Sequence, residues 1–305
     1  MTYSISIDAL RALDAIDRKG SFAAAAEALY KVPSALSYTV AKLESDLGVS
    51  LFDRSKQRAQ LTAAGQLLLQ QGRQILLASQ QLEDAVKQLD TGWERQLTLA
   101  VESLVPWQPV FSVVDAFHSK GRMTQVVLQE EVMAGCWEAL QSGRADLAIG
   151  LTGEGVSGQF QLEPLAAVEF VFAVAPHHQL ASLNHPIGAE DVLAHTAIVL
   201  ADTAVDLPRR DSGLMDSRRR VIVSSMAAKI AAHQAGLGVG FLPKHLIQSA
   251  LQQGSLVALP SAIPREPVML YLGWRKNQPM GEAAKWFMTQ LRTLDWRTVL
   301  RGDIA

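Results

Sequence analysis

The side chains best suited to chemistry lie on one face of a helix that is predicted to begin near Pro33. Four polar residues recur on this face, away from the leucines of the same segment: Ser34, Ser37, Tyr38 and Lys42. Hydroxylated, aromatic and basic groups at helical spacing suit a DNA groove, where they reach base edges and phosphates. Pro33 fits the first helical turn, where a missing backbone N–H costs no hydrogen bond. A helical hairpin with a solvated polar face has the same periodicity, so the flanking sequence must decide.

This helix is the second of a pair predicted within residues 21–48, and the break at residues 30–32 leaves room only for a tight turn. Apolar and small residues recur three or four positions apart in both helices. They are Phe22, Ala25, Ala26 and Leu29 in the first helix, and Leu36, Val40, Leu43 and Leu47 in the second. Ser21 is placed to cap the first helix and Gly48 to end the second. Short helices that cross steeply at a tight turn are typical of a helix-turn-helix, whose second helix enters the DNA major groove.

Two further segments flank this pair. Residues 5–18 are predicted to form a helix that packs under it, and residues 49–61 two short strands around a basic tip. The tip carries Arg54, Lys56 and Arg58, which would contact phosphates and so position the protein on DNA without specifying its sequence. Taken alone, this tip could be a solvated charged loop. Its place beside a helix-turn-helix favours the DNA contact.

A single long helix is predicted from Thr62, its cap, to about Asp90. Residues on one side of it alternate steps of four and three, as in a heptad seam. The large line is Leu68, Ile75, Leu82 and Leu89, and the other line is Ala64, Gln71, Ala78 and Ala85. Large and small lines suit two helices packed side by side, so the segment predicts dimerisation. The alternative is a lone amphipathic helix docked on its own domain.

From about residue 93 the pattern changes to alternating strands and helices, which predicts a parallel sheet covered by helices. The first unit has strands at 96–101, 124–129 and 145–149 and helices at 110–118 and 133–140. A second α/β unit is predicted over about 168–268, with strands at 170–175, 197–200 and 220–223 and a helix at 226–235. The last strand (268–274) and helix (281–294) are expected to return to the first unit. Two lobes joined by crossing strands would leave a cleft between them.

Ligands of such sheets bind at the carboxyl ends of strands and near helix N-termini. Ser103 ends the first predicted strand, and Ser225 leads into the helix at 226–235. Their hydroxyls and nearby backbone N–H groups could hold a carboxylate, phenolate or nitro oxygen, although an ordinary helix cap would explain either serine alone. Trp107, Trp137 and Phe241 are candidate apolar walls, with core packing as the simpler account of each.

Composition narrows the class of protein. At 305 residues, with 19% charged residues, the chain is globular and long enough for about two domains. A net charge of −2 argues against a protein that coats nucleic acid indiscriminately. The single cysteine, Cys136, excludes an internal disulfide and fits a reducing compartment, with a buried structural thiol favoured over a reactive one. With no secretory signal and no long apolar run in view, we expect a cytoplasmic, soluble protein.

No catalytic constellation is visible. The sequence has no Gly-x-Ser-x-Gly elbow, no phosphate-binding Gly-Lys-Ser/Thr loop and no His-Glu-x-x-His zinc motif. The glycines of 236–240 follow a helix, whereas a dinucleotide fingerprint follows a strand and opens a helix. We therefore expect no catalytic residue, no metal and no cofactor. An enzyme acting on a small metabolite through the α/β half, with a fused DNA-binding head, is the alternative.

Residues 7–65 resemble the DNA-binding domain of the LysR-type transcriptional regulators. The resemblance rests on Gly20-Ser21-Phe22, Ala25-Ala26, Ser34-Ala35-Leu36-Ser37, Leu43-Glu44, Leu47-Gly48, Leu51-Phe52, Arg54 and Leu61-Thr62-Ala63-Ala64-Gly65. It implies DNA contacts by Ser21, Pro33, Ser34, Ser37, Tyr38, Lys42, Arg54, Lys56 and Arg58. Val32-Pro33 departs from the family, which more often has a capping Ser or Thr followed by a base-facing Gln. Base reading is therefore expected to shift to Ser34, Ser37 and Tyr38.

The second half resembles the effector-binding domain of the same family, whose fold is that of periplasmic binding proteins. Residues 143–149, 176–181 and 235–243 carry this likeness. It implies a winged helix-turn-helix (1–65), a linker and dimerisation helix (66–92) and a two-lobed effector domain (93–305). Lobe I would span about 93–167 and 269–305, and lobe II about 168–268. The implied partners are promoter DNA, a second copy in a homodimer or homotetramer, and a small-molecule effector, aromatic or carboxylate, held by Ser103, Val132, Thr203, Ser225 and Phe241.

Overall fold

The computed structural model describes residues 4–53, 60–153, 158–210, 217 and 219–301. The chain divides into two compact units, an N-terminal unit (Met1–Asp90) and a C-terminal unit (Thr91–Ala305), and each is described by itself.

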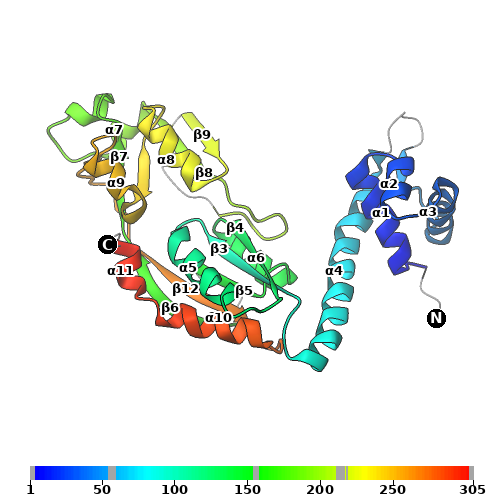
Figure 1. Cartoon of the computed structure of the whole chain (residues 1–305). Helices are drawn as coiled ribbons and strands as arrows, with labels where there is room; N and C mark the ends of the chain where they lie inside the picture. Colours follow the sequence, from blue (N-terminus) through cyan, green and yellow to red (C-terminus); the bar gives the residue numbers. More distant parts are fainter. Residues whose placement is uncertain (1–3, 54–59, 154–157, 211–216, 218, 302–305) are drawn as a thin grey trace. The chain divides into compact units, whose positions relative to one another are not determined.

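Three helices form the body of the N-terminal unit: α1 (Ile7–Lys19), α2 (Phe22–Ala28) and α3 (Pro33–Leu47) (Figure 1). Ser21 caps α2, because its Oγ accepts a hydrogen bond from the backbone N–H of Ala24. Gly48 ends α3 with φ 68°, a left-handed conformation that favours glycine. The predicted helices and both predicted helix ends are confirmed.

The turn between α2 and α3 is tight. Tyr30 has φ 53°, and the N–H of Lys31 reaches back to the carbonyl of Ala26. Val32 occupies the cap position of α3 without a side-chain hydrogen bond, and Pro33 is in the first turn, as predicted. The core beneath this turn consists of inward-facing residues of all three helices, namely Leu13, Ile16, Ala25, Ala26, Leu36, Val40 and Leu43.

The wing is a pair of short antiparallel strands, β1 (Phe52–Asp53) and β2 (Gln60–Leu61). Glu44 of α3 holds its base, because Oε1 accepts hydrogen bonds from the backbone N–H groups of Leu51 (2.7 Å) and Phe52 (3.2 Å). The predicted phosphate contacts Arg54, Lys56 and Arg58 lie outside the described residues.

The long helix α4 spans Ala63–Thr91, and the Thr62 hydroxyl caps it by accepting from the N–H of Gly65. Its first turns belong to the N-terminal unit, because Leu69 is buried and Leu68 is partly buried against the core of α1 to α3. Arg73 fixes the contact with α1 through ion pairs to Asp14 (2.7 Å) and Asp17 (2.8 Å).

Leu68 therefore packs, at least in part, against the core of its own N-terminal unit. The sequence analysis had predicted that it would contact a second copy of the chain. Farther along α4, Ile75 is 47% exposed, Leu82 66% and Val86 59%. These three residues lie within a narrow stripe of the helix surface, because seven and eleven residues are close to whole numbers of turns. The side chain of Leu89 is outside the described part of the chain.

A five-stranded sheet forms lobe I of the C-terminal unit, in the order β4-β3-β5-β12-β6. Its strands are β3 (Gln96–Glu102), β4 (Gln125–Glu131), β5 (Leu147–Thr152), β6 (Phe160–Val168) and β12 (Val268–Arg275). β4, β3 and β5 are parallel, and β12 runs antiparallel to both of its neighbours, β5 and β6, so β6 has the same direction as the first three strands. The prediction of a parallel sheet is therefore wrong for β12 alone, and β6 was not predicted. The predicted return of the last strand to the first unit is confirmed.

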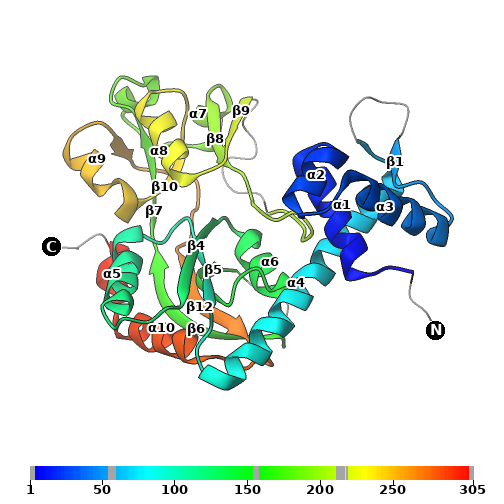
Figure 2. The ribbon, with the colours of Figure 1, turned by 45° about the vertical axis from the view of Figure 1, so that its right-hand side comes forward.

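Helices cover both faces of this sheet, as the alternation along its strands requires. Leu97, Leu99 and Val101 pack with α5 (Trp107–His118), α10 (Glu282–Thr293) and α11 (Trp296–Arg301). Ala100 and Ala148 face the other way and pack with α6 (Ala134–Ser142). Figure 2 shows α5 and α10 on one side and α6 on the other.

Lobe II is built on an antiparallel sheet of three strands, β10-β7-β11, and a parallel pair, β8-β9. The strands are β7 (Phe170–Val174), β8 (Thr196–Leu200), β9 (Arg219–Val223), β10 (Gly240–Pro243) and β11 (Val257–Leu259). Its helices are α7 (Ala189–Leu193), α8 (Met226–Gln234) and α9 (Gln248–Gln252), with 3-10 turns at Gln179–Ser182 and Lys244–Ile247. A side chain at Gly238 would lie 2.3 Å from the carbonyl oxygen of Thr196, so this glycine lets the chain pass β8 closely.

Candidate functional site

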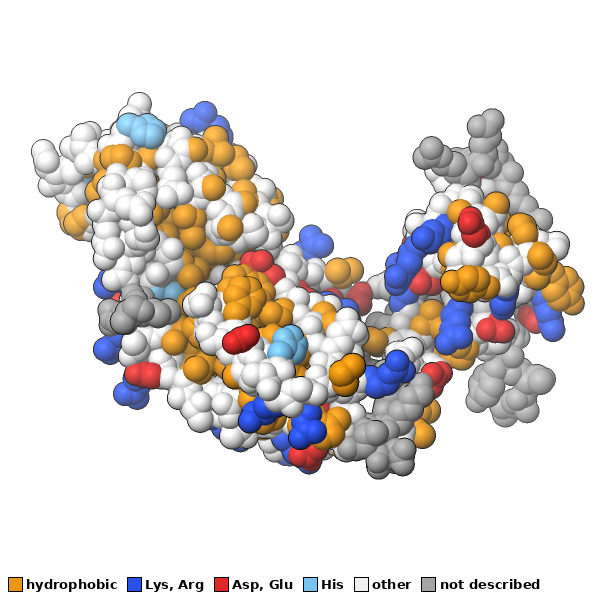
Figure 3. Space-filling view, in the orientation of Figure 1, with side chains coloured by type: hydrophobic (Ala, Val, Ile, Leu, Met, Phe, Trp, Pro, Cys, Tyr) orange, Lys and Arg blue, Asp and Glu red, His pale blue; other side chains and the backbone are white. Residues whose placement is uncertain are grey.

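The outer face of α3 is open to solvent. All of its predicted DNA contacts, Pro33, Ser34, Ser37, Tyr38 and Lys42, are exposed, and so is Ser21. Tyr38 is 70% exposed although it is a large aromatic residue. The face of the N-terminal unit seen in Figure 3 carries several Lys and Arg side chains beside exposed hydrophobic ones. An exposed tyrosine can contact a partner through both its ring and its hydroxyl group, so this face is available as a contact surface.

The inner face of the same helix is anchored. Leu36, Val40 and Leu43 are at most 2% exposed, and Glu44 ties α3 to the wing. A rigid helix that presents polar groups is what base reading needs, because contacts to base edges must be held in register. Tyr30 and Val32, which are 99% and 62% exposed, extend this surface at the start of α3 and were not among the predicted contacts.

The C-terminal unit contains a cavity of about 300 Å³ between its two lobes. Figure 3 shows hydrophobic side chains gathered where the lobes meet. Lobe I lines the cavity with the end of β3, the start of α6 and the end of β5. Lobe II and the connecting segments supply the remainder. The lining residues are Glu102, Ser103, Leu104, Met133, Thr152, Gly153, Phe170, Leu200, Arg210, Met226, Lys229, Phe241, Ile263, Pro264, Arg265 and Val268.

Glu102 is the one carboxylate among these lining residues, and it is only 2% exposed. Its Oε2 accepts a hydrogen bond from the N–H of Leu104 (2.7 Å), and its Oε1 accepts from the N–H of Met133 (3.2 Å) and the hydroxyl of Ser103 (3.1 Å). Burial outweighs these hydrogen bonds and raises the pKa of Glu102 from 4.5 to about 7. The lobe I wall therefore carries an acid that titrates near neutral pH.

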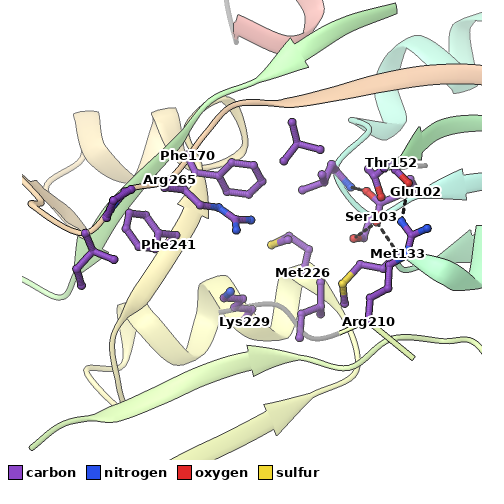
Figure 4. Close-up of a pocket in the computed structure, with 16 residues that line it drawn as sticks. Glu102, Ser103, Met133, Thr152, Phe170, Arg210, Met226, Lys229, Phe241 and Arg265 are labelled. Carbon is purple, nitrogen blue, oxygen red and sulfur yellow. Dashed lines mark hydrogen bonds between the residues drawn. The ribbon is translucent and has the colours of Figure 1, made fainter. Parts of the chain in front are cut away.

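Lobe II presents cations to the same cavity. Lys229 of α8 is 5% exposed, and burial, with a smaller contribution from the charge of Arg265, lowers its pKa from 10.5 to about 8. The guanidinium carbon of Arg265 lies 4.4 Å from the ring centroid of Phe170. Figure 4 shows Lys229 and Arg265 directed toward one region beside Phe170, with Glu102 and Ser103 on the opposite side. The sequence analysis identified neither cation.

The structure places two of the five predicted effector contacts, Ser103 and Phe241, in the cavity lining. Val132 is buried and directly precedes the lining residue Met133. Ser225 directly precedes the lining residue Met226, and its hydroxyl caps α8 by accepting a hydrogen bond from the N–H of Ala228.

The hydroxyl of Thr203 is engaged within the protein: it donates to Glu131 Oε2 (2.5 Å) and accepts from the N–H of Val132 (2.9 Å). Thr203, Val132 and Ser225 are absent from the cavity lining; Val132 and Ser225 directly precede the lining residues Met133 and Met226, and Thr203 is hydrogen-bonded to Val132. Trp137 is 2% exposed and donates its indole N–H to the carbonyl of Thr152, which confirms core packing for this residue.

Acidic side chains hold the segment after β8 against the start of α6. Asp202 accepts hydrogen bonds from the N–H groups of Ala134 and Gly135, and Glu138 accepts from three consecutive N–H groups of residues 205–207. A side chain at Gly135 would lie 1.8 Å from the Thr203 hydroxyl oxygen, so only glycine fits there. The sequence offered no periodic signal for this network, because its members lie more than sixty residues apart.

Other chemical candidates are structural. Cys136 is fully buried, and burial raises the pKa of its thiol, which fits the structural role expected from the sequence. Within the described ranges, no group of three or more His, Cys, Asp or Glu side chains is arranged to hold a metal ion. No helix in that part of the chain is long and apolar enough to cross a membrane.

Both units match models of protein families. Residues 7–66 match bacterial regulatory helix-turn-helix proteins of the lysR family, and residues 90–295 match the LysR substrate binding domain. The chain is 38% identical over 288 residues to the uncharacterized HTH-type transcriptional regulator YeeY of Escherichia coli K12, covering 93% of this chain and 92% of YeeY. It is 37% identical over 292 residues to the probable regulator YhaJ of the same organism, covering 95% and 97%.

Solved structures agree with the fold. Full-length CbnR complexed with its target DNA superposes with a TM-score of 0.62 at 20% identity, covering 94% of this chain and 99% of CbnR. ArgP from Mycobacterium tuberculosis gives a TM-score of 0.56 at 24% identity, covering 96% of this chain and 97% of ArgP. At this identity the likeness concerns the fold alone.

Proposed function

We propose that this chain, which belongs to the LysR family of transcriptional regulators, reads promoter DNA with α3 and responds to a small molecule held in the cavity of the C-terminal unit. The observation that carries the proposal is the polar outer face of α3, exposed on a helix whose inner face is fixed in the core. The same face has no role in an enzyme, and the family and its relatives are transcriptional regulators.

For the DNA contacts, Ser34, Ser37 and Tyr38 would read base edges, and Lys42 would reach a phosphate. Ser21 and Pro33 lie at helix starts, where backbone N–H groups can approach a phosphate. The wing residues Arg54, Lys56 and Arg58 would add phosphate contacts on sequence grounds. We propose a domain division at residues 65 and 92, with α4 as the linker.

We further propose that two copies pair through α4. Ile75 and Leu82, joined by Val86, form an exposed apolar stripe on this helix. Leu89 would continue it on sequence grounds, whereas Leu68 would contribute only at its exposed edge. A symmetric dimer presents two reading heads to two half-sites, so a pseudo-palindromic operator is expected, read by a dimer or a tetramer.

The proposed effector is an aromatic or carboxylate compound that fills the cavity between the lobes. Phe170 and Phe241 supply aromatic walls, and Ser103 supplies a hydroxyl. Since lobe I and lobe II both line the cavity, a ligand that prefers one lobe arrangement would shift the population toward it. That shift would change the placement of the DNA-binding heads in the dimer and so the affinity for the operator.

The test combines two measurements on the full-length protein. A thermal-shift screen of small aromatic and carboxylate compounds identifies ligands that bind the folded state. Each ligand is then added to a titration of the protein with a promoter fragment that it selects from genomic DNA. We expect the affinity or the protected region to change. A ligand that stabilises the protein but leaves both unchanged would contradict the proposed coupling, and one that is turned over would favour an enzyme.

A further inference from the structure

Lobe II places two positive charges at the cavity without an anionic partner among the described residues. Lys229 is 5% exposed, and its ammonium group makes no hydrogen bond or ion pair there. Its nearest charged influence is another cation, Arg265, which lies over the ring of Phe170. A buried charge is normally paired, because the cost of removing it from water must be offset.

Two partly buried arginines of the same unit are paired with carboxylates. Arg144 lies 2.7 Å from Glu131, and Arg275 lies 3.6 Å from Asp146. Lys229 departs from this pattern although it is more deeply buried than either of them. The departure leaves a positive charge at the cavity with no acidic partner among the described residues.

Among the described residues around Lys229, none serves as a counter-ion. β7 and β10 face the cavity with Phe170 and Phe241, and β8 faces it with Leu200. His233, on the same helix one turn later, is buried and its pKa is lowered to about 4, so it is neutral. Glu102 is the only acid in the lining, and both of its oxygens accept hydrogen bonds from lobe I.

A lysine can also extend its ammonium group to bulk water while burying its stem. An exposure of 5% leaves little room for that arrangement. The side chain is instead directed into the cavity (Figure 4).

We propose that Lys229 and Arg265 form an oxyanion subsite in lobe II, and that the ligand of this cavity is a small monoanion, a carboxylate attached to an aromatic body. The carboxylate would lie between the two cations, which donate charge-assisted hydrogen bonds. The body would pack against Phe170, Phe241 and Met226. The inference rests on the proposed function only in taking this ligand to be the effector.

The opposite wall restricts the far end of the ligand. Glu102 is ready to accept a hydrogen bond and, when ionised, repels a second negative charge. A hydroxyl or amine at the far end of the ligand, where it can donate to Glu102, is therefore favoured.

The test uses benzoate as the probe and benzamide as its neutral counterpart of nearly the same shape. Thermal shift and calorimetric titration of the full-length protein should show stabilisation by benzoate and little or none by benzamide. Lys229→Met keeps an unbranched side chain as far as Cε and removes the ammonium group, so its apparent Kd for benzoate should be at least about tenfold weaker, equivalent to about 1.4 kcal/mol. Lys244→Met, which removes an exposed lysine of the same lobe, is the control and should keep the wild-type Kd.

The melting temperature without ligand and a second variant, Arg265→Gln, complete the test. Without ligand, Lys229→Met should melt at or above the wild-type temperature, because the substitution removes an unpaired buried charge; a structural lysine would give a lower Tm. If Lys229→Met does not fold, Arg265→Gln takes its place, with the same expected loss of benzoate binding. Equal stabilisation by benzoate and benzamide, or a wild-type response in both variants, would overturn the proposal.

The outcome is separate from that of the proposed function, because DNA is absent from these measurements. Wild-type protein that binds benzoate through Lys229 but prefers no promoter fragment would support the subsite and contradict the regulator. Protein that selects promoter fragments but does not bind benzoate would support the regulator and contradict the subsite.

Discussion

Replacing Glu102 by glutamine should change how the stability of the protein depends on pH. Glu102 is buried and has a pKa of about 7 in the folded protein, against 4.5 ordinarily. Between these values the folded state holds a proton that the unfolded state has lost, so the wild-type free energy of unfolding falls as the pH rises from 4.5 to 7. Because glutamine does not titrate, the free energy of unfolding of the variant should not fall with pH in this way.

The magnitude follows from the two pKa values. Their difference, at about 1.36 kcal/mol per pKa unit, corresponds to about 3 kcal/mol of unfolding free energy. The amide also costs something at every pH, because its NH2 group cannot accept from the N–H of Leu104 or Met133, whereas both oxygens of a carboxyl group have lone pairs that can. A lost hydrogen bond of this kind costs roughly 1 kcal/mol. The variant should therefore be slightly less stable than wild type near pH 4.5 and about 2 kcal/mol more stable near pH 8.

Urea unfolding of both proteins at several pH values measures this difference directly, provided that the C-terminal unit unfolds in one step. The informative quantity is the change with pH, because the hydrogen-bond cost cancels from it. Parallel stability curves for wild type and Glu102→Gln would show that Glu102 has an ordinary pKa and would refute the argument from burial.

Three further predictions concern recognition and assembly. Leu82→Lys should break the dimer by placing a charge in the α4 stripe, whereas Leu67→Lys, at a similarly exposed leucine away from the stripe, should not; an intact Leu82→Lys dimer in sedimentation would contradict the pairing. Tyr38→Ala should cost about 1–3 kcal/mol of discrimination between operator and random DNA, whereas Arg54→Ala should weaken both alike and reduce the salt dependence. Titration at two salt concentrations checks this, and an equal loss of both by Tyr38→Ala would count against base reading. Benzoate affinity should fall from pH 6 to pH 9, because Glu102 ionises near 7 and Lys229 loses its proton near 8; calorimetry showing a flat profile would contradict the cavity assignment.

The fold of the N-terminal unit was largely predictable because the residues that determine its helices and turns lie close together in the sequence. Helical periodicity, a serine cap at Ser21 and a left-handed glycine at Gly48 each act within a few residues. The exposed face of α3 follows directly from its buried face. Leu68 is the exception, because a heptad position does not reveal whether its partner is a second copy or the same chain.

The sheet of lobe I was only partly predictable. β6 lacks a clear alternation and contains Pro164, which normally argues against a strand. The proline is tolerated because β6 lies at the edge of the sheet. The antiparallel direction of β12 depends on long-range connectivity, which no local pattern encodes.

The cation subsite was the least predictable feature. Lys229 and Arg265 are thirty-six positions apart, and a single cation on a helix or in a loop usually means a solvated surface. One signal was available: Lys229 follows Met226 by three residues, so the two share a helix face in an alanine-rich segment. Recognising that this face looks into a cavity required the fold.

The central claim, that the chain is a regulator which reads specific promoter DNA, is tested most directly by competition. Purified full-length protein is mixed with genomic promoter fragments and an excess of scrambled duplexes, with and without cell extract as a source of effector. The account predicts retention of a small set of promoter fragments and a change in that retention with extract. Equal binding to promoter and scrambled DNA under both conditions would contradict it.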